Sequence, residues 1–298
     1  MDLQLGSRGS RLALWQARWV ADRLRAAGHA VEIEIIRTRG DRLENVPLTS
    51  SGTKGLFIKE IEEALLDGRI HAAVHSLKDL PSELASGLTL AAVPEREDPR
   101  DALVSKDALS LYQLPRRARI GTGSLRRQSQ LRALRPDLEF VALRGNVDTR
   151  LTKLERGDCD ALVLAAAGLN RLGYGGRATQ YFLEAEICPA VGQGALAIEV
   201  RSSDRETQTT VAALDSAPSR QAVRAERAVL AALGGGCQLP LAAHGVVENG
   251  VLHLHAVIAA ADGSRVLRAA ASGSPTGPEA LGQQVAEELT RQGARAFL

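Results

Sequence analysis

The sequence predicts an α/β protein made of two similar halves, followed by a smaller α+β domain. In the first two-thirds of the 298 residues, short apolar runs alternate with stretches of helical periodicity. This alternation is typical of a mostly parallel sheet with helices on both faces. Polar or glycine-rich breaks at 94–100 and 189–194 divide the region into halves joined by two crossings. The halves are expected to form a clamshell whose ligand cleft lies beyond the carboxyl ends of the strands.

Strands and helices alternate in the first half. The run Val31–Thr38 alternates polar and apolar residues with period two, as a half-buried strand does. Ser10 is a suitable N-cap for the helix that follows it. The strands are expected at Leu3–Leu5, Val31–Thr38, Ala72–Ser76, Leu88–Val93 and Ala195–Val200, and the helices at Arg11–Ala27 and Leu56–Leu66.

The second half repeats this pattern, and the tail departs from it. In the second half we expect strands at Arg119–Gly121, Leu138–Leu143 and Ala161–Ala165, and helices at Leu125–Leu134 and Val147–Arg156. In the tail, the turn residues 248–250 between two strand-like runs predict a β-hairpin. The tail's expected elements are a helix at Ser219–Leu233, strands at Leu241–Val247, Val251–Ala259 and Arg265–Ser272, and a helix at Pro278–Arg291.

The chain is too long for one compact core, which indicates two or three domains. The breaks in the pattern predict three. The first is residues 1–94 together with 195–213, the second is residues 95–194, and the third is the α+β domain of residues 214–298.

Composition excludes several classes of partner and compartment. The formal net charge is only +2, from 37 basic and 35 acidic residues, so no overall field favours nucleic acid. No signal peptide and no membrane span are apparent, and three widely spaced cysteines without a CxxC pair fit a reducing compartment. We therefore expect a cytoplasmic protein. We expect no metal site, because His253 and His255 alternate on one strand without a third ligand nearby in the sequence.

Arginines follow the predicted strands of both halves. Arg8 lies in the loop Gly6–Ser10 before a helix, and Arg126 and Arg127 lie in a comparable position in the second half. Helix N-termini attract anions, and each guanidinium matches a carboxylate. Arg144 and Arg150 extend the pattern. The set predicts a ligand with several carboxylates, and the alternative is that these are surface arginines on solvated helices. The loops fit no nucleotide-binding motif.

Lys78 and Asp79 follow a buried apolar run at the end of a predicted strand. Charged side chains at a buried strand end cost free energy of folding unless they form an ion pair or serve a function. One interpretation is that the carboxylate stabilises a cation that develops on the substrate and takes its proton. The other is a structural ion pair or turn.

Cys237 follows three consecutive glycines, 234–236, on a loop after a helix. Consecutive glycines let the backbone approach a bound group closely. The cysteine is therefore a candidate nucleophile or attachment point, and the alternative is a packing residue. Cys159 and Cys188 fit packing roles.

The chain resembles the porphobilinogen deaminase (hydroxymethylbilane synthase) family over nearly its whole length. The matching segments occur in the family's order. They are GSRGSRLALWQA (6–17), TKGLFIKE (53–60), AVHSLKDLP (73–81), EREDPRDALVS (95–105), GTGSLRRQSQL (121–131), LRGNVDTRL (143–151), PAVGQGALAIE (189–199) and GGGCQLPLAA (234–243).

The resemblance implies a fold, a reaction and a cofactor. The fold would be two periplasmic-binding-protein-like (type II) α/β domains and a C-terminal α+β domain with a three-stranded antiparallel sheet. The enzyme would be a monomer that condenses four porphobilinogen molecules head to tail, with loss of ammonia, and then releases linear hydroxymethylbilane by hydrolysis. Its dipyrromethane cofactor would be bound through a thioether to Cys237. Each pyrrole carries an acetate and a propionate, which would explain the arginines.

The resemblance also assigns individual residues. Asp79, with Lys78, would be catalytic, and Gly123 stands where the family commonly has a serine. The positions implied to bind the cofactor are Cys237, Ser10, Lys78, Asp79, Thr122, Ser124, Arg126, Arg127, Arg144, Gly145, Gln193 and Gly194, and those implied to bind the substrate are Arg8, Ser10, Phe57, Arg144, Arg150 and Arg171.

Two other classes of function stay open at this point. One is a non-catalytic binding protein of the same clamshell architecture, which would bind an organic anion reversibly and need no cysteine at the cleft. The other is a thiol-dependent transferase that acts on a different polycarboxylate.

Overall fold

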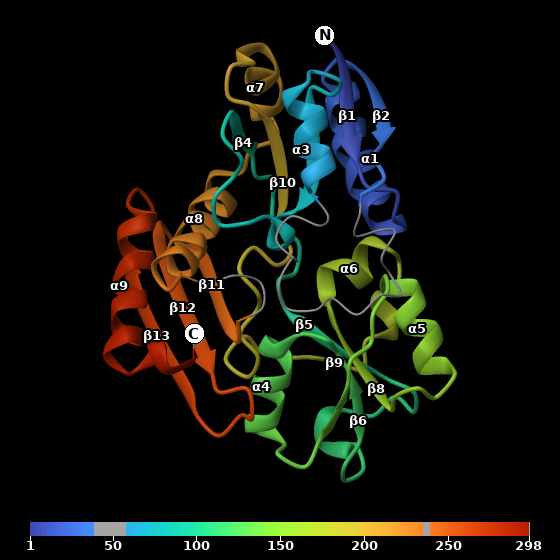
Figure 1. Cartoon of the computed structure of the whole chain (residues 1–298), viewed down its shortest axis with the longest axis vertical. Helices are drawn as coiled ribbons and strands as arrows, with labels where there is room; N and C mark the ends of the chain where they lie inside the picture. The colour runs from blue at the N-terminus through green and yellow to red at the C-terminus, as the bar shows by residue number, and fades with distance from the viewer. Residues whose placement is uncertain (39–57, 235–238, 298) are drawn as a thin grey trace. The chain divides into compact units, whose positions relative to one another are not determined.

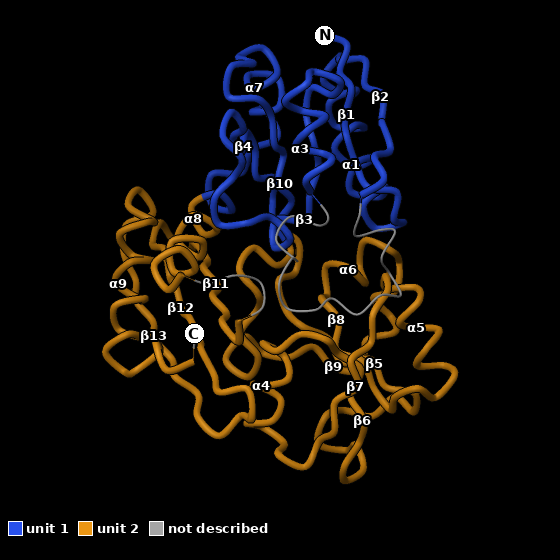
Figure 2. Tube along the Cα trace, viewed as in Figure 1, with its two compact units in different colours: residues 1–96, 195–220 blue, residues 97–194, 221–298 orange. Residues whose placement is uncertain are grey.

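The computed structural model of the chain describes residues 1–38, 58–234 and 239–297 (Figure 1). These residues form two compact units (Figure 2). Unit 1 comprises residues 1–96 and 195–220, and unit 2 comprises residues 97–194 and 221–298. The three-domain division expected from the sequence stays a prediction.

Unit 1 is built on a five-stranded mixed sheet in the order β2-β1-β3-β10-β4. Strands β1, β2 and β3 run parallel, and β10 runs antiparallel to both of its neighbours. The strands are β1 (Asp2–Ser7), β2 (Ala30–Ile35), β3 (Ala72–Ser76), β4 (Leu88–Ala92) and β10 (Leu196–Arg201); the helices are α1 (Arg11–Ala26), α3 (Lys59–Leu66), α7 (Arg205–Ala212) and the 3-10 turn η1 (Leu77–Asp79).

Helix α1 forms because its apolar residues recur at helical spacing and its first turn is capped. The Ser10 hydroxyl accepts a hydrogen bond from the Ala13 N–H, 3.3 Å away, which satisfies one of the unpaired donors of the first turn. Val20 and Leu24 lie on the buried stripe of the helix and pack in one core with Leu5 of β1. This core fixes the loop between β1 and α1, in which Arg8 lies.

Unit 2 contains a second five-stranded mixed sheet, in the order β7-β6-β8-β5-β9. Strands β6, β7 and β8 are parallel, and β5 is antiparallel to β8 and β9. The strands are β5 (Asp101–Ser105), β6 (Arg119–Gly121), β7 (Glu139–Val141), β8 (Ala161–Ala165) and β9 (Gln180–Tyr181); the helical segments are α4 (Leu125–Leu134), α5 (Val147–Glu155), α6 (Ala166–Arg171), η2 (Leu111–Gln113) and η3 (Gly175–Arg177).

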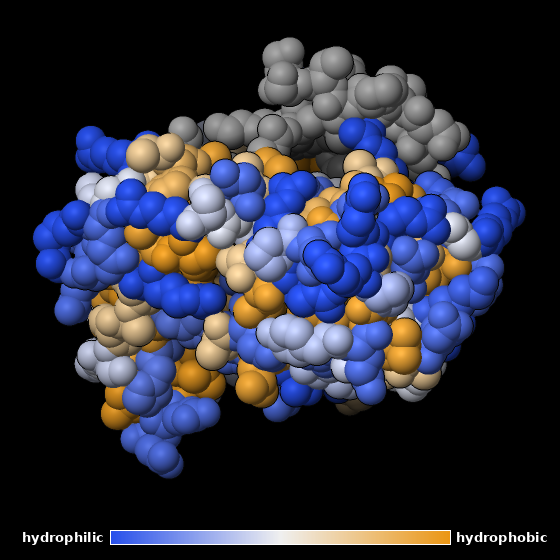
Figure 3. Space-filling model, turned by 90° about the horizontal axis from the view of Figure 1, so that it is seen from below, coloured by the Kyte–Doolittle hydropathy of each residue, from blue (hydrophilic) through white to orange (hydrophobic). Residues whose placement is uncertain are grey.

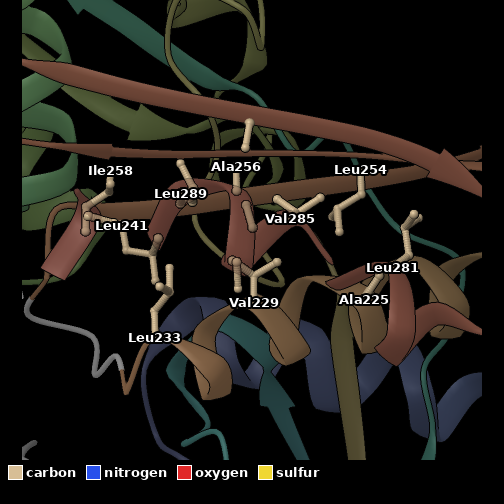
Figure 4. Close-up of a cluster of buried hydrophobic side chains, with 14 of the residues drawn as sticks. Ala225, Val229, Leu233, Leu241, Leu254, Ala256, Ile258, Leu281, Val285 and Leu289 are labelled. Carbon is tan, nitrogen blue, oxygen red and sulfur yellow. The ribbon is translucent and has the colours of Figure 1, made fainter. Parts of the chain in front are cut away.

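A three-stranded antiparallel sheet with the order β11-β12-β13 completes unit 2. One face of this sheet packs against helices α8 and α9, and Figure 4 shows Val229 of α8 and Val285 of α9 directed toward Ala256 of β12. The elements are α8 (Ala217–Ala232), whose first residues belong to unit 1, β11 (Leu241–Glu248), β12 (Val251–Ala259), β13 (Val266–Gly273), α9 (Pro278–Arg291) and η4 (Ala294–Phe297).

The predicted fold class is confirmed, since two α/β sheets and a three-stranded antiparallel sheet with helices are present. Within the described residues, the expected strands and helices agree with the structure to within a few residues at their ends. The first two residues of the expected helix Leu56–Leu66 lie outside the described residues. Strand β5 was not expected, nor were β9, α6 and α7. On the face in Figure 3, apolar areas are interspersed with polar and charged residues. Within the described ranges, no helix is both long and apolar enough to cross a bilayer.

Candidate functional site

Asp79 is held at the end of the central strand β3 of unit 1. The strand AAVHS is buried between β1 and β10, and it passes directly into the turn η1, in which Leu77 is buried. The Leu80 N–H donates to the Leu77 carbonyl at 3.1 Å and closes the turn. Because Leu77 points into the core, the next two side chains, the half-buried Lys78 and the exposed Asp79, point toward solvent.

A pocket brings Asp79 together with two other predicted site residues, Arg8 and Ser10. Arg8 precedes the N-terminus of α1, and Ser10 is its N-cap, so a guanidinium group and the positive end of a helix dipole both contribute to the lining of the pocket. The Ser10 hydroxyl caps α1 through its oxygen, which leaves its hydrogen to donate. The pocket therefore combines a carboxylate with cationic and hydroxyl donors.

Two buried residues that the sequence analysis did not assign support the wall of this pocket. His75, which lines the pocket, has its Nε2 3.1 Å from Oε2 of Glu199 on the neighbouring strand β10. Both side chains are almost fully buried. Burial raises the pKa of the nearby Glu62, and the charge of Glu199 adds to that effect. A charged residue inside the apolar run of β10 was the sequence signal that could have revealed Glu199.

In unit 2, three predicted site residues converge on one carboxylate, that of Asp101. Arg126 Nη1 donates to Oδ2 of Asp101 at 2.6 Å, and Arg127 donates to Oδ1 from Nε at 2.9 Å and from Nη2 at 2.7 Å. Gln193 Nε2 donates to the same Oδ1 at 3.1 Å. All four side chains are buried. Arg126 and Arg127 therefore have protein partners in this structure, and their assignment to the cofactor stays a prediction.

The charged groups around Asp101 shift one another's pKa values. Burial alone would raise the pKa of Asp101, but the Arg126 and Arg127 guanidinium groups outweigh it and hold that pKa well below its usual range. Burial lowers the pKa of the Arg127 guanidinium, and Asp101 opposes the change. The carboxylate is thus ionised at any physiological pH, and it fixes both arginines at the N-terminal end of α4.

The loop between β6 and α4 presents Thr122 and Ser124. The Ser124 hydroxyl accepts from the Arg127 N–H at 3.5 Å as the cap of α4, and Thr122 Oγ1 accepts from the Ser124 N–H at 3.2 Å. Thr122 is buried, whereas Ser124 is half-buried. At Gly123, an added Cβ would meet only the Leu143 carbonyl, at 3.8 Å, so the loop has room for the serine that is common in the resembled family.

Arg144 and Gly145 lie on the loop between β7 and α5, and Arg150 lies near the start of α5. Gly145 has φ +105°, a conformation that favours glycine, and its carbonyl accepts from Arg150 Nε at 2.9 Å. The Asn146 side chain caps α5. Arg144 is exposed, so its side chain can reach a ligand.

Arg171 at the end of α6 binds the segment at Gly194, where the chain passes from unit 2 back to unit 1. Its Nη2 donates to the Gly194 carbonyl at 2.7 Å, and burial lowers the pKa of Arg171 to about 10. Gly194 has φ +87°, and a Cβ there would collide with the Glu97 carbonyl. Gly194 is thus required for the close approach of the segments at which the chain enters unit 2, at Glu97, and leaves it, at Gly194. Phe57 and Cys237 lie outside the described residues.

Two family models cover almost all of the chain. The model "Porphobilinogen deaminase, dipyromethane cofactor binding domain" matches residues 3–209, and "Porphobilinogen deaminase, C-terminal domain" matches residues 220–291. The chain belongs to the porphobilinogen deaminase family. The predicted family and the predicted dipyrromethane cofactor are both confirmed.

Curated porphobilinogen deaminases align with the chain from end to end. The protein of Syntrophotalea carbinolica is 51% identical, over 99% of this chain and 95% of the relative. The protein of Moorella thermoacetica is 50% identical, over 100% and 96%, and that of Roseiflexus sp. is 52% identical, over 99% and 98%. Among solved structures, a YaeC-family lipoprotein from Enterococcus faecalis aligns with a TM-score of 0.45 at 12% identity, over 70% of this chain and 89% of its own.

Proposed function

We propose that this chain is a hydroxymethylbilane synthase. It condenses four porphobilinogen molecules head to tail, loses one ammonia at each addition, and releases linear hydroxymethylbilane by hydrolysis. The observation that carries the proposal is the full-length match to porphobilinogen deaminases at about half of all positions, together with the cofactor-domain match. We further propose that the enzyme acts in the cytoplasm as a monomer.

The residues around Asp79 fit a dipyrromethane cofactor and a pyrrole substrate. Pyrroles of this pathway carry acetate and propionate groups, which need cationic and hydrogen-bonding partners, and the pocket offers Arg8 and Ser10. When bound, the cofactor would supply the nucleophilic pyrrole carbon to which the first porphobilinogen is added. We assign its attachment to the Cys237 thiol.

Asp79 is assigned the proton transfers and the electrostatic stabilisation. Loss of ammonia from porphobilinogen leaves positive charge on the pyrrole, and the Asp79 carboxylate in the same pocket stabilises that charge. The same carboxylate accepts the proton released when the new carbon–carbon bond forms. Lys78, the preceding residue on the turn, is assigned a supporting contact to the cofactor.

The arginines of unit 2 are assigned two different duties. The exposed Arg144, on the loop before α5, and the half-buried Arg150, near the start of α5, bind carboxylates of the growing chain. Arg126 and Arg127 hold the loop with Thr122 and Ser124 in place, because Asp101 anchors both of them, and their remaining N–H donors serve the cofactor. Arg171 and Gln193 fix Gly194 and the return crossing.

A product assay with matched cysteine variants tests the proposal. Purified protein is incubated with porphobilinogen, and ammonia and the released linear tetrapyrrole are both measured. We expect one ammonia for each porphobilinogen consumed, no turnover by Cys237→Ala, and turnover by the control Cys159→Ala, whose thiol is buried. Binding of porphobilinogen without release of ammonia would support a binding protein instead, and turnover by Cys237→Ala would remove the tethered cofactor from the account.

A further inference from the structure

A cluster of three possible metal ligands lies in unit 2 on the β11–β12–β13 sheet. His244 of β11 and His255 of β12 are paired directly in the antiparallel register. Their side chains therefore project from the same face of the sheet, with the ring centroids 5.5 Å apart. Neighbouring positions Ala243 and Leu254 face the core formed with α8 and α9, so the histidines lie on the opposite face.

Glu184, from the loop after β9, completes the cluster. Its Oε2 lies 3.0 Å from Nδ1 of His244, although it is 60 residues away in the sequence. One ligand atom from each of Glu184, His244 and His255 lies within 4.8 Å of the other two. Three donor atoms from three separate segments thus converge on one point.

The two imidazoles have few hydrogen-bond partners. Within the described part of the chain, the buried Nε2 of His255 makes no hydrogen bond, and the buried Nδ1 of His244 makes none beyond its close contact with Glu184. The His244 side chain is only 5% exposed. A buried polar atom without a partner is costly, on the order of 1–3 kcal/mol, and native structures rarely leave one unexplained.

The donor set suits a transition-metal ion. Two imidazole nitrogens and one carboxylate oxygen are ligands that Zn²⁺ takes in proteins, with a water or other group in the fourth position. The Glu184 side chain is 35% exposed, which leaves the ion a path from solvent.

We propose that Glu184, His244 and His255 bind a divalent transition-metal ion, for which Zn²⁺ is the probe. The ion links the loop that carries Glu184 to strands β11 and β12, and so ties together two parts of unit 2 that are distant in the sequence. None of the three residues lines the Asp79 pocket, so the proposed metal site is separate from that pocket.

Zinc binding by matched variants tests the site. Tag-free, cofactor-loaded protein is treated with a chelator and titrated with Zn²⁺ by calorimetry, and a parallel sample with Co²⁺ is examined for its visible ligand-field bands. Wild type is expected to bind one equivalent and to melt at a higher temperature with Zn²⁺. Glu184→Ala and His255→Ala should each weaken binding at least tenfold, and His255→Ala should change the Co²⁺ spectrum.

The control is His253→Ala. His253 lies on the same face of β12, two residues from His255, but its Nδ1 is 2.8 Å from the Ser272 hydroxyl and it is outside the cluster. This variant should bind Zn²⁺ as wild type does. The proposal is overturned if folded wild-type protein binds no Zn²⁺, or if Glu184→Ala and His255→Ala bind it with wild-type affinity. Porphobilinogen turnover, measured on the same samples, reports the proposed function separately.

Discussion

At the scale of single residues, Asp101 is the clearest example of a position that the structure explains and the sequence conceals. Its carboxylate receives Arg126, Arg127 and Gln193, which come from 25, 26 and 92 residues away. In the sequence it is one acid in a polar segment. The three partners were all selected as candidates for ligand binding, and the sequence contained no signal that they share one buried acceptor.

Replacement of Asp101 should therefore destabilise the fold. In Asp101→Asn the two buried guanidinium groups lose their counter-charge, and breaking a buried pair in this way costs about 3–5 kcal/mol. Denaturant unfolding measures the loss. The control Asp107→Asn changes an exposed side chain and should be nearly neutral. Equal stabilities of the two variants would contradict the role given to Asp101.

The pH dependence of stability follows from the ion pairs of Asp101 with Arg126 and Arg127. The pKa of Asp101 is lower in the folded protein than its value of about 3.9 in the unfolded chain. Its contribution to stability is therefore complete above about pH 4 and is lost as the pH falls toward the folded value. The free energy of unfolding of wild type should fall more steeply below pH 4 than that of Asp101→Asn. Parallel curves would contradict the assignment.

Asp79 should matter for catalysis and little for stability, because its side chain is exposed. Asp79→Asn keeps the shape of the side chain and removes its charge and basicity, so turnover should fall by about 10²–10⁴. The rate of ammonia release measures this, with Asp67→Asn, another exposed acid of unit 1, as the control. A near-wild-type rate for Asp79→Asn would remove this residue from the proton transfers.

At the scale of secondary-structure elements, periodicity predicted most of the fold. Helices α4 and α9 have the expected bounds because residues adjacent in the sequence mark where they begin. Ser124 caps α4, and Pro278 is the first residue of α9. Strand β5 was missed because it is short and follows a polar segment, and because its partners β8 and β9 lie far along the chain. Strand β9 has two residues, too few to show a period.

Close packing of α8 and α9 gives a prediction at this scale. A Cβ on Gly282 of α9 would collide with the Ala225 carbonyl and lie 2.6 Å from the Ala228 Cβ. Gly282→Ala should therefore cost about 1–3 kcal/mol from overpacking, even though alanine favours a helix by about 1 kcal/mol. Gln283→Ala, on the exposed face of α9, is the matched control, and thermal unfolding compares them. A Gly282→Ala variant that unfolds at a higher temperature than wild type would contradict the prediction, because it would mean that α8 and α9 move apart at little cost in free energy.

At the scale of the whole molecule, the sequence motifs were more informative than composition. They identified the family, which the full-length relatives confirm. The structure joins Arg8, Ser10 and Asp79 in one pocket of unit 1, and it joins Arg126, Arg127 and Gln193 in unit 2. Glu184, His244 and His255 could not be grouped from the sequence, because a strand register and a distant loop bring them together.

The central claim is that a pyrrole chain grows while covalently attached to this protein. The mass of the intact, denatured protein tests it most directly. The mass of purified wild type should exceed that of its sequence by two pyrrole units, and it should increase by single pyrrole units after brief exposure to porphobilinogen. The Cys237→Ala variant should have the mass of its bare sequence under both conditions. A fully active wild-type protein whose mass equals that of the bare sequence would contradict the account.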